Sequence, residues 1–151
     1  KLKIIIIYPN NDPFSDDIIG YYRSIANLDN IKIIKTLPFG DYLSLLKNSI
    51  FLIGNSSGGI IETPSLGIPN ILVGYRQKGR ELAKNTIHSK LNKKDIHNMI
   101  SKSLNDSAFL RSCKLMNNPY LNKNQVFPSV KIINILKNKN LKDIKNKQIS
   151  Y

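Results

Sequence analysis

The chain has 151 residues, of which 41% are hydrophobic. That is enough for one ordinary domain with a buried core, and it excludes a chain that is disordered throughout. The 23 lysines and arginines outnumber the 10 acidic residues, which gives a net charge of +13. Lysine is spread along the chain among Asn and Ile, and no nucleic-acid motif accompanies it, so we expect no nucleic-acid partner.

A single cysteine, Cys113, excludes an internal disulfide and a metal site built on paired cysteines. No apolar run approaches the roughly 20 residues that a membrane span needs, and no signal-peptide pattern precedes the first strand. We therefore expect a soluble cytoplasmic protein with no membrane partner, no metal and no cofactor.

The first third of the chain alternates strand and helix patterns. Residues 1–8, "KLKIIIIY", form a continuous apolar run, which is typical of a strand covered on both faces in a parallel sheet. A loop follows, and Ser15 with two aspartates after it predicts the N-cap of a helix over 16–27. A short strand over 31–35 and a helix over 41–48 come next.

The rest of the chain continues this alternation, with apolar runs as strands and periodic apolar residues as helices. The strands are expected over 50–53, 70–73 and 85–88, and the helices over 60–66, 93–105 and 129–137. Gly67 suits the end of the helix over 60–66, because glycine adopts a left-handed backbone freely. We assign residues 1–136 to one domain and 137–151 to a Lys/Asn-rich tail.

This pattern predicts an α/β fold, a Rossmann-like parallel sheet with helices on both faces. Such sheets bind ligands at the carboxyl ends of their strands. The loops expected there are "PNND", "TLPF", "GNSSGG" and "GYRQKGR", one after each of the first four strands. We expect these loops to meet at one edge of the sheet.

The glycine-rich turn over 54–59, "GNSSGG", has two interpretations. It can hold a phosphate through backbone N–H groups at the start of a helix, with Ser56 and Ser57 as hydroxyl donors. Alternatively, Gly-x-Ser-x-Gly is the pattern of a nucleophile elbow, which needs an acid and then a histidine as partners. The candidates, Asp95 with His88 or His97, are poorly placed for a triad, so the phosphate interpretation is favoured.

Two further features flank this turn. Glu62 follows one helical turn later and is either a solvated carboxylate or an acceptor for two ribose hydroxyls. Arg76, Lys78 and Arg80 lie in the loop after the next strand and form either a solvated basic loop or a phosphate clamp.

Several stretches resemble the hydrolysing UDP-N-acetylglucosamine 2-epimerases of the sialic-acid pathway. The most specific is "IGNSSGGIIETPSLGIPNILVGYRQKGRELAKNTI"; "YPNNDPFSDDI", "TLPFGDYLSLLKNS" and, more weakly, "NPYLNKN" also match. The resemblance implies the C-terminal half of a two-domain GT-B fold, within an enzyme that converts UDP-GlcNAc to UDP and N-acetylmannosamine. It also implies a homo-oligomer, and UDP held mostly by this half.

Carried over by position, the resemblance implies eight residues that contact UDP or the substrate. They are Asn10, Leu37, Ser56, Ser57, Gly58, Gly59, Glu62 and Arg76. The serines are then phosphate donors, Glu62 holds the ribose and the Leu37 backbone meets the uracil. The family's catalytic carboxylates and histidine lie upstream of these residues, so no catalytic residue is assigned and this chain alone is expected to be inactive.

The sequence departs from the family at two places. The family's "D-x-G-S" segment has lost its glycine and reads "DPFS", and its "NPYGDG" turn reads "NPYLNK". A related diacetamido sugar also stays open as the substrate, and two alternatives to the hydrolysing epimerase remain. The chain could belong to another GT-B sugar-nucleotide enzyme, such as a non-hydrolysing epimerase or a glycosyltransferase, or it could be a nucleotide-binding module without catalysis.

Overall fold

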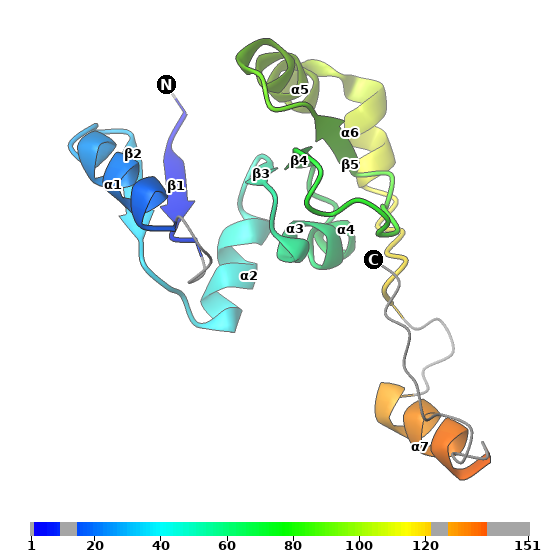
Figure 1. Cartoon of the computed structure of the whole chain (residues 1–151). Helices are drawn as coiled ribbons and strands as arrows, with labels where there is room; N and C mark the ends of the chain where they lie inside the picture. The colour runs from blue at the N-terminus through cyan, green and yellow to red at the C-terminus, as the bar shows by residue number, and fades with distance from the viewer. Residues whose placement is uncertain (1, 10–14, 122–126, 139–151) are drawn as a thin grey trace.

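The structure is a computed structural model that describes residues 2–9, 15–121 and 127–138 (Figure 1). Asn10 and the departing "DPF" segment lie outside the described residues. So does the predicted tail from residue 139 onward, and the domain boundary stays a prediction.

Strands and helices alternate along the chain as the sequence predicts. The first half contains β1 (Ile4–Ile7), α1 (Ser15–Ile25), β2 (Ile31–Ile34) and α2 (Phe39–Lys47). The middle contains β3 (Leu52–Gly54), α3 (Ser57–Ile61), α4 (Thr63–Leu66), β4 (Asn70–Val73) and β5 (Thr86–Ser89). The remainder is helical, with α5 (Lys93–Asn105), α6 (Ser107–Cys113) and α7 (Pro128–Asn138).

All strand pairs in the described residues are parallel, which confirms the predicted fold class. The strands form two groups rather than one continuous sheet: β1 pairs with β2, and β4 lies between β3 and β5. Figure 1 shows α5 and α6 on one side of the three-stranded sheet and α3 and α4 on the other, with α2 between the two strand groups.

The core is centred on β4, the middle strand of the larger sheet. Ile71 and Leu72 of β4 are buried, as are Ile60 from α3 and Leu46 from α2. A strand buried on both faces is what the unbroken apolar run "NILV" predicts. The larger sheet therefore fixes the position of the turn that precedes α3.

Three details differ from the sequence predictions. Ser15 is the first residue of α1 rather than its cap. The single helix expected over 60–66 is two short helices that meet at Glu62, because Pro64 has no N–H to bond the preceding turn. Helix α6 was not predicted. By contrast, the predicted helix end at Gly67 is confirmed by its left-handed φ of 66°.

Candidate functional site

The glycine-rich turn begins where β3 ends. Ser56 has an extended backbone, and its Oγ accepts a hydrogen bond of 3.3 Å from the Gly58 N–H, so Ser56 is the N-cap of α3. The Ser56 side chain is exposed and Ser57 is half-buried. Helix α3 has only five residues, so its dipole contributes little and any anion would depend on direct hydrogen-bond donors.

The geometry of this turn argues against a nucleophile elbow. Such an elbow is a strained turn, whereas Ser56 has an ordinary φ of −73°. The expected partners are engaged elsewhere: His88 Nε2 donates to the Gly74 carbonyl at 2.6 Å, and Asp95 accepts from the Lys90 N–H at 2.7 Å. Ser56 is therefore better described as a capping residue with a hydroxyl at the surface.

The two glycines that follow lie in close contact with neighbouring side chains. A Cβ at Gly58 would lie 2.8 Å from Glu62 Oε2 and 3.1 Å from Tyr42 Oη. A Cβ at Gly59 would lie 2.7 Å from Asn70 Oδ1. Gly58 thus leaves room for the Glu62 carboxylate beside the turn, and Gly59 lets α3 approach the sheet.

Glu62 has an unusual environment for a carboxylate at a helix junction. Its Oε2 is buried and has no hydrogen-bond partner among the described residues. Burial raises the pKa of the Glu62 carboxyl above its ordinary value. Burial, and then the charge of Glu62, also raise the pKa of the Tyr42 hydroxyl. A carboxylate with an unused acceptor is suited to accept hydrogen bonds from a ligand hydroxyl.

The basic loop is attached directly to the glycine-rich turn. Gln77 is buried, and its Nε2 donates to the Asn55 carbonyl at 2.9 Å. Arg76 precedes Gln77 and is exposed. The loops after β3 and β4 therefore meet, as the sequence predicts. Gln77 itself was missed, because one glutamine in a basic loop carries no distinctive signal.

The loop after β2 leads to the same edge of the sheet as the glycine-rich turn. It contains Leu37, which is half-buried, and continues into α2, whose Tyr42 reaches the turn at Gly58. Tyr42 was also missed from the sequence, where it reads as one more residue of an amphipathic helix. Of the eight predicted contact residues, those on the glycine-rich turn lie together with Glu62. Leu37 and Arg76 lie on the loops that lead to this edge, and Asn10 falls outside the described residues.

The "NPY" segment near the end of the chain has a structural role that the sequence did not reveal. Asn118 is buried, and its Nδ2 donates to the Ile61 carbonyl at 2.8 Å and to Ser65 Oγ at 2.6 Å. Its Oδ1 accepts from the Tyr120 N–H at 2.9 Å. Asn118 therefore connects the segment after α6 to the junction of α3 and α4, where Glu62 lies.

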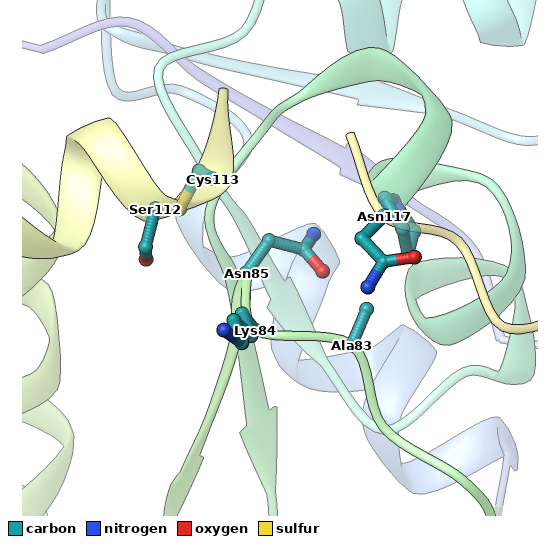
Figure 2. A pocket seen from close by; sticks show the side chains of 7 residues that line it. Ala83, Lys84, Asn85, Ser112, Cys113 and Asn117 are labelled. Atoms are coloured by element: carbon teal, nitrogen blue, oxygen red, sulfur yellow. The ribbon is translucent and has the colours of Figure 1, made fainter. Parts of the chain in front are cut away.

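A separate pocket lies at the opposite edge of the sheet, before β5 begins (Figure 2). Its lining residues are Pro64, Ala83, Lys84, Asn85, Ser112, Cys113 and Asn117. Asn85 donates to Thr63 Oγ1 and the Ile68 carbonyl, and burial raises the pKa of the Cys113 thiol, which disfavours a reactive thiolate. Because doubly wound sheets bind ligands at the carboxyl ends of their strands, this pocket is not the candidate site.

Within residues 2–9, 15–121 and 127–138, no group of three or more His, Cys, Asp or Glu side chains could hold a metal ion. No helix in the same ranges is long and apolar enough to cross a membrane.

The described residues thus define a doubly wound α/β domain whose polar side chains gather at the carboxyl ends of its strands. The family description "UDP-N-acetylglucosamine 2-epimerase" matches residues 1–137, and the chain belongs to that family.

Two curated relatives illustrate the similarity. The chain is 37% identical over 107 residues to a UDP-N-acetylglucosamine 2-epimerase of Neisseria meningitidis, covering 71% of this chain and 28% of that protein. It is 44% identical over 69 residues to a hydrolysing GDP/UDP-N,N'-diacetylbacillosamine 2-epimerase of Campylobacter jejuni, covering 46% and 18%.

Solved structures support the fold. A co-structure of S. aureus MnaA with UDP matches 96% of this chain with a TM-score of 0.67 at 23% sequence identity, and the match covers 38% of that chain. The chain thus spans between about a fifth and two fifths of the length of the proteins that it matches.

Proposed function

We propose that these residues form the C-terminal, UDP-binding part of a hydrolysing UDP-N-acetylglucosamine 2-epimerase. One observation carries the site assignment. In a chain of this family, the Glu62 carboxylate keeps a buried oxygen that has no hydrogen-bond partner in the part of the chain that the structure describes, and the glycine beside it leaves it room. Two adjacent ribose hydroxyls are donors that such a carboxylate can accept.

The turn and the basic loop complete the proposed site. Ser56 and Ser57 donate to the diphosphate, and Arg76 adds a cationic fork. Gln77 holds the basic loop against the turn at Asn55. When the glycosidic C–O bond breaks, negative charge develops on the departing UDP, and donors fixed around the diphosphate stabilise it.

The sugar is recognised mainly by the rest of the longer protein. The groups that transfer protons also belong to that part. The main candidate is UDP-GlcNAc, with N-acetylmannosamine as a product that sialic-acid synthesis can use. A UDP-linked diacetamido sugar is the second candidate, because the most identical of the two relatives described above acts on such a sugar.

To test this, the full-length protein is incubated with either sugar nucleotide, and proton NMR identifies the products. The proposal predicts free UDP and a free sugar inverted at C2. Formation of UDP-ManNAc without release of UDP would indicate non-hydrolysing chemistry, and no reaction with either substrate would contradict an epimerase.

A contact-level test separates the diphosphate site from the sugar site. Replacing both Ser56 and Ser57 by Ala removes two hydroxyl donors, so we expect UDP affinity to fall by roughly 1–3 kcal/mol, the scale of hydrogen bonds to a charged group. Uridine has no phosphate and should bind nearly as before. Equal losses for UDP and uridine in calorimetry would show that the serines do not contact the diphosphate.

A further inference from the structure

Side-chain oxygens from three parts of the fold converge beside Gly58. Apart from the backbone of α3 and the adjacent residues, the heavy atoms nearest to the position of a Gly58 Cβ are Glu62 Oε2 at 2.8 Å, Tyr42 Oη at 3.1 Å and Ser56 Oγ at 3.6 Å. Tyr42 belongs to α2, Ser56 to the glycine-rich turn and Glu62 to the junction of α3 and α4. Of these three, Tyr42 has no role in the site as described so far.

Tyr42 is directed at the turn by the helix that carries it. Its N–H donates to the Pro38 carbonyl at 3.0 Å at the start of α2. Leu46 lies one turn later on the same face of α2 and is buried, so this face packs against the domain. Tyr42 is itself half-buried, and α2 lies next to α3 and α4 in Figure 1. The phenol hydroxyl is therefore held at the edge of the proposed site.

Glu62 and Tyr42 have complementary hydrogen-bonding capacities. An ionised carboxylate can only accept, whereas a phenol can donate. The two groups do not satisfy each other, since Glu62 Oε2 has no partner among the described residues. Burial, and then the charge of Glu62, raise the pKa of the Tyr42 hydroxyl, so the phenol keeps its proton at neutral pH. The site thus offers an acceptor and a donor close together.

This combination is suited to a ligand hydroxyl. A hydroxyl can donate to Glu62 Oε2 and accept from Tyr42 Oη at the same time. A carbonyl or phosphate oxygen has no proton to donate to the carboxylate, and an ammonium group has no lone pair to accept from the phenol. Only an alcohol uses both groups.

Ser56 is the other hydroxyl near this point, and it is less well placed. Its Oγ is the farthest of the three oxygens and already accepts from the Gly58 N–H at 3.3 Å. Its side chain is exposed, whereas Tyr42 is half-buried. A hydrogen bond shielded from water discriminates more strongly between ligands, which favours Tyr42 as the donor.

We propose that Tyr42 is a specificity-determining residue of the nucleotide site, and that its hydroxyl donates to the same ribose hydroxyl that donates to Glu62. This inference rests on the proposed function, which places the ribose at Glu62. A bound ligand without the shared hydroxyl would leave both the carboxylate and the phenol unpaired, and unpaired polar groups in a closed site are costly. The pair therefore selects a ribonucleotide over the nucleotide that lacks this hydroxyl.

To test this, calorimetry measures the affinity of the full-length protein for UDP, 2′-deoxy-UDP and 3′-deoxy-UDP. The ligands share base and diphosphate, so only contacts to the ribose hydroxyls differ. The wild type should bind the ligand without the shared hydroxyl more weakly than UDP by roughly tenfold or more. Tyr42→Phe should weaken UDP binding roughly threefold to tenfold. The variant should bind that deoxy ligand at least as tightly as the wild type does.

The matched control is Tyr21→Phe, which removes the hydroxyl of a tyrosine on α1 that is 65% exposed. It should leave the affinities for UDP and both deoxy ligands unchanged. A loss in this control as large as in Tyr42→Phe would contradict a specific role of Tyr42.

Other outcomes would also overturn the proposal. Unchanged UDP affinity in Tyr42→Phe, or equal losses for all the ligands, would show that Tyr42 does not contact a ribose hydroxyl. If Ser56→Ala rather than Tyr42→Phe lost the discrimination, Ser56 would be the donor. In these cases the wild type still discriminates, so the ribose stays at Glu62. A wild type that binds all the ligands equally would also contradict the ribose site of the proposed function.

Discussion

Among single residues, Glu62 has opposite effects on folding and on binding: burying its charge opposes folding, whereas its free acceptor favours ligand binding. Its buried Oε2 has no partner among the described residues, and burial raises its pKa. The folded state therefore holds a proton on Glu62 more tightly than the unfolded state does. Its contribution to stability is greatest below the ordinary carboxyl pKa and falls as pH rises from there through the raised pKa.

Glu62→Gln should weaken binding without weakening the fold. The amide removes the charge that is costly to bury, so we expect an unchanged or higher melting temperature at neutral pH. Uridine affinity should fall roughly tenfold, because the Gln amide keeps a neutral acceptor, and hydrogen bonds to a charged acceptor are stronger than those to a neutral one by roughly 1–1.5 kcal/mol. Wild-type affinity should rise with pH through the raised pKa, since ribose hydroxyls favour the ionised form. Uridine has no phosphate that titrates in the same range, and an unchanged affinity in the variant would remove Glu62 from the site.

A second prediction for a single residue concerns Gly58. In Gly58→Ala the new Cβ would lie 2.8 Å from Glu62 Oε2, so the carboxylate must move. We expect weaker uridine binding with little loss of stability, because Ala is favoured over Gly in a helix by up to about 1 kcal/mol. Gly40→Ala is the matched control, since nothing lies within 4 Å of its new Cβ. Similar uridine affinities in the two variants would show that the space at Gly58 is not used for binding.

At the scale of elements, Asn118 holds the junction between α3 and α4. Its side chain is buried and makes three hydrogen bonds, to Ile61, Ser65 and Tyr120. Asn118→Ala should lower the free energy of unfolding by roughly 2–4 kcal/mol, because the hydrogen bonds are lost and buried polar groups are left unpaired.

Tyr120→Phe is the control for this prediction in urea denaturation. It removes only the exposed hydrogen bond from Tyr120 Oη to the Glu81 carbonyl and should cost less than about 1 kcal/mol. If both variants were equally stable, Asn118 would not be the residue that holds the two helices together.

Sequence patterns predicted the elements well where one local signal dominated. The apolar run "NILV" gave β4 with its observed bounds, and the helix over 93–105 was also predicted with its observed bounds. The division at Glu62 was missed because the apolar spacing of residues 60–66 continues through Pro64, and the missing hydrogen bond at that proline decides the structure.

At the scale of the whole molecule, the site could be predicted only in part. The glycine-rich turn and Glu62 have a recognisable spacing, and strand–helix alternation placed them at one edge of a parallel sheet. Tyr42, Gln77 and Asn118 could not be predicted, because their roles depend on contacts between segments that are distant in sequence. The separation into two strand groups could not be predicted either, since β1 has the sequence of a fully covered strand.

UDP is proposed to bind at the carboxyl ends of the strands, on the glycine-rich turn and the basic loop. The most direct measurement is hydrogen exchange of the full-length protein with and without UDP, followed by mass spectrometry of its peptides. We predict slower exchange over residues 54–62 and 75–80, with no change over 83–85 at the pocket of Figure 2. Protection at 83–85, or binding of UDP without protection of the turn and the basic loop, would show that UDP does not bind at this edge of the sheet.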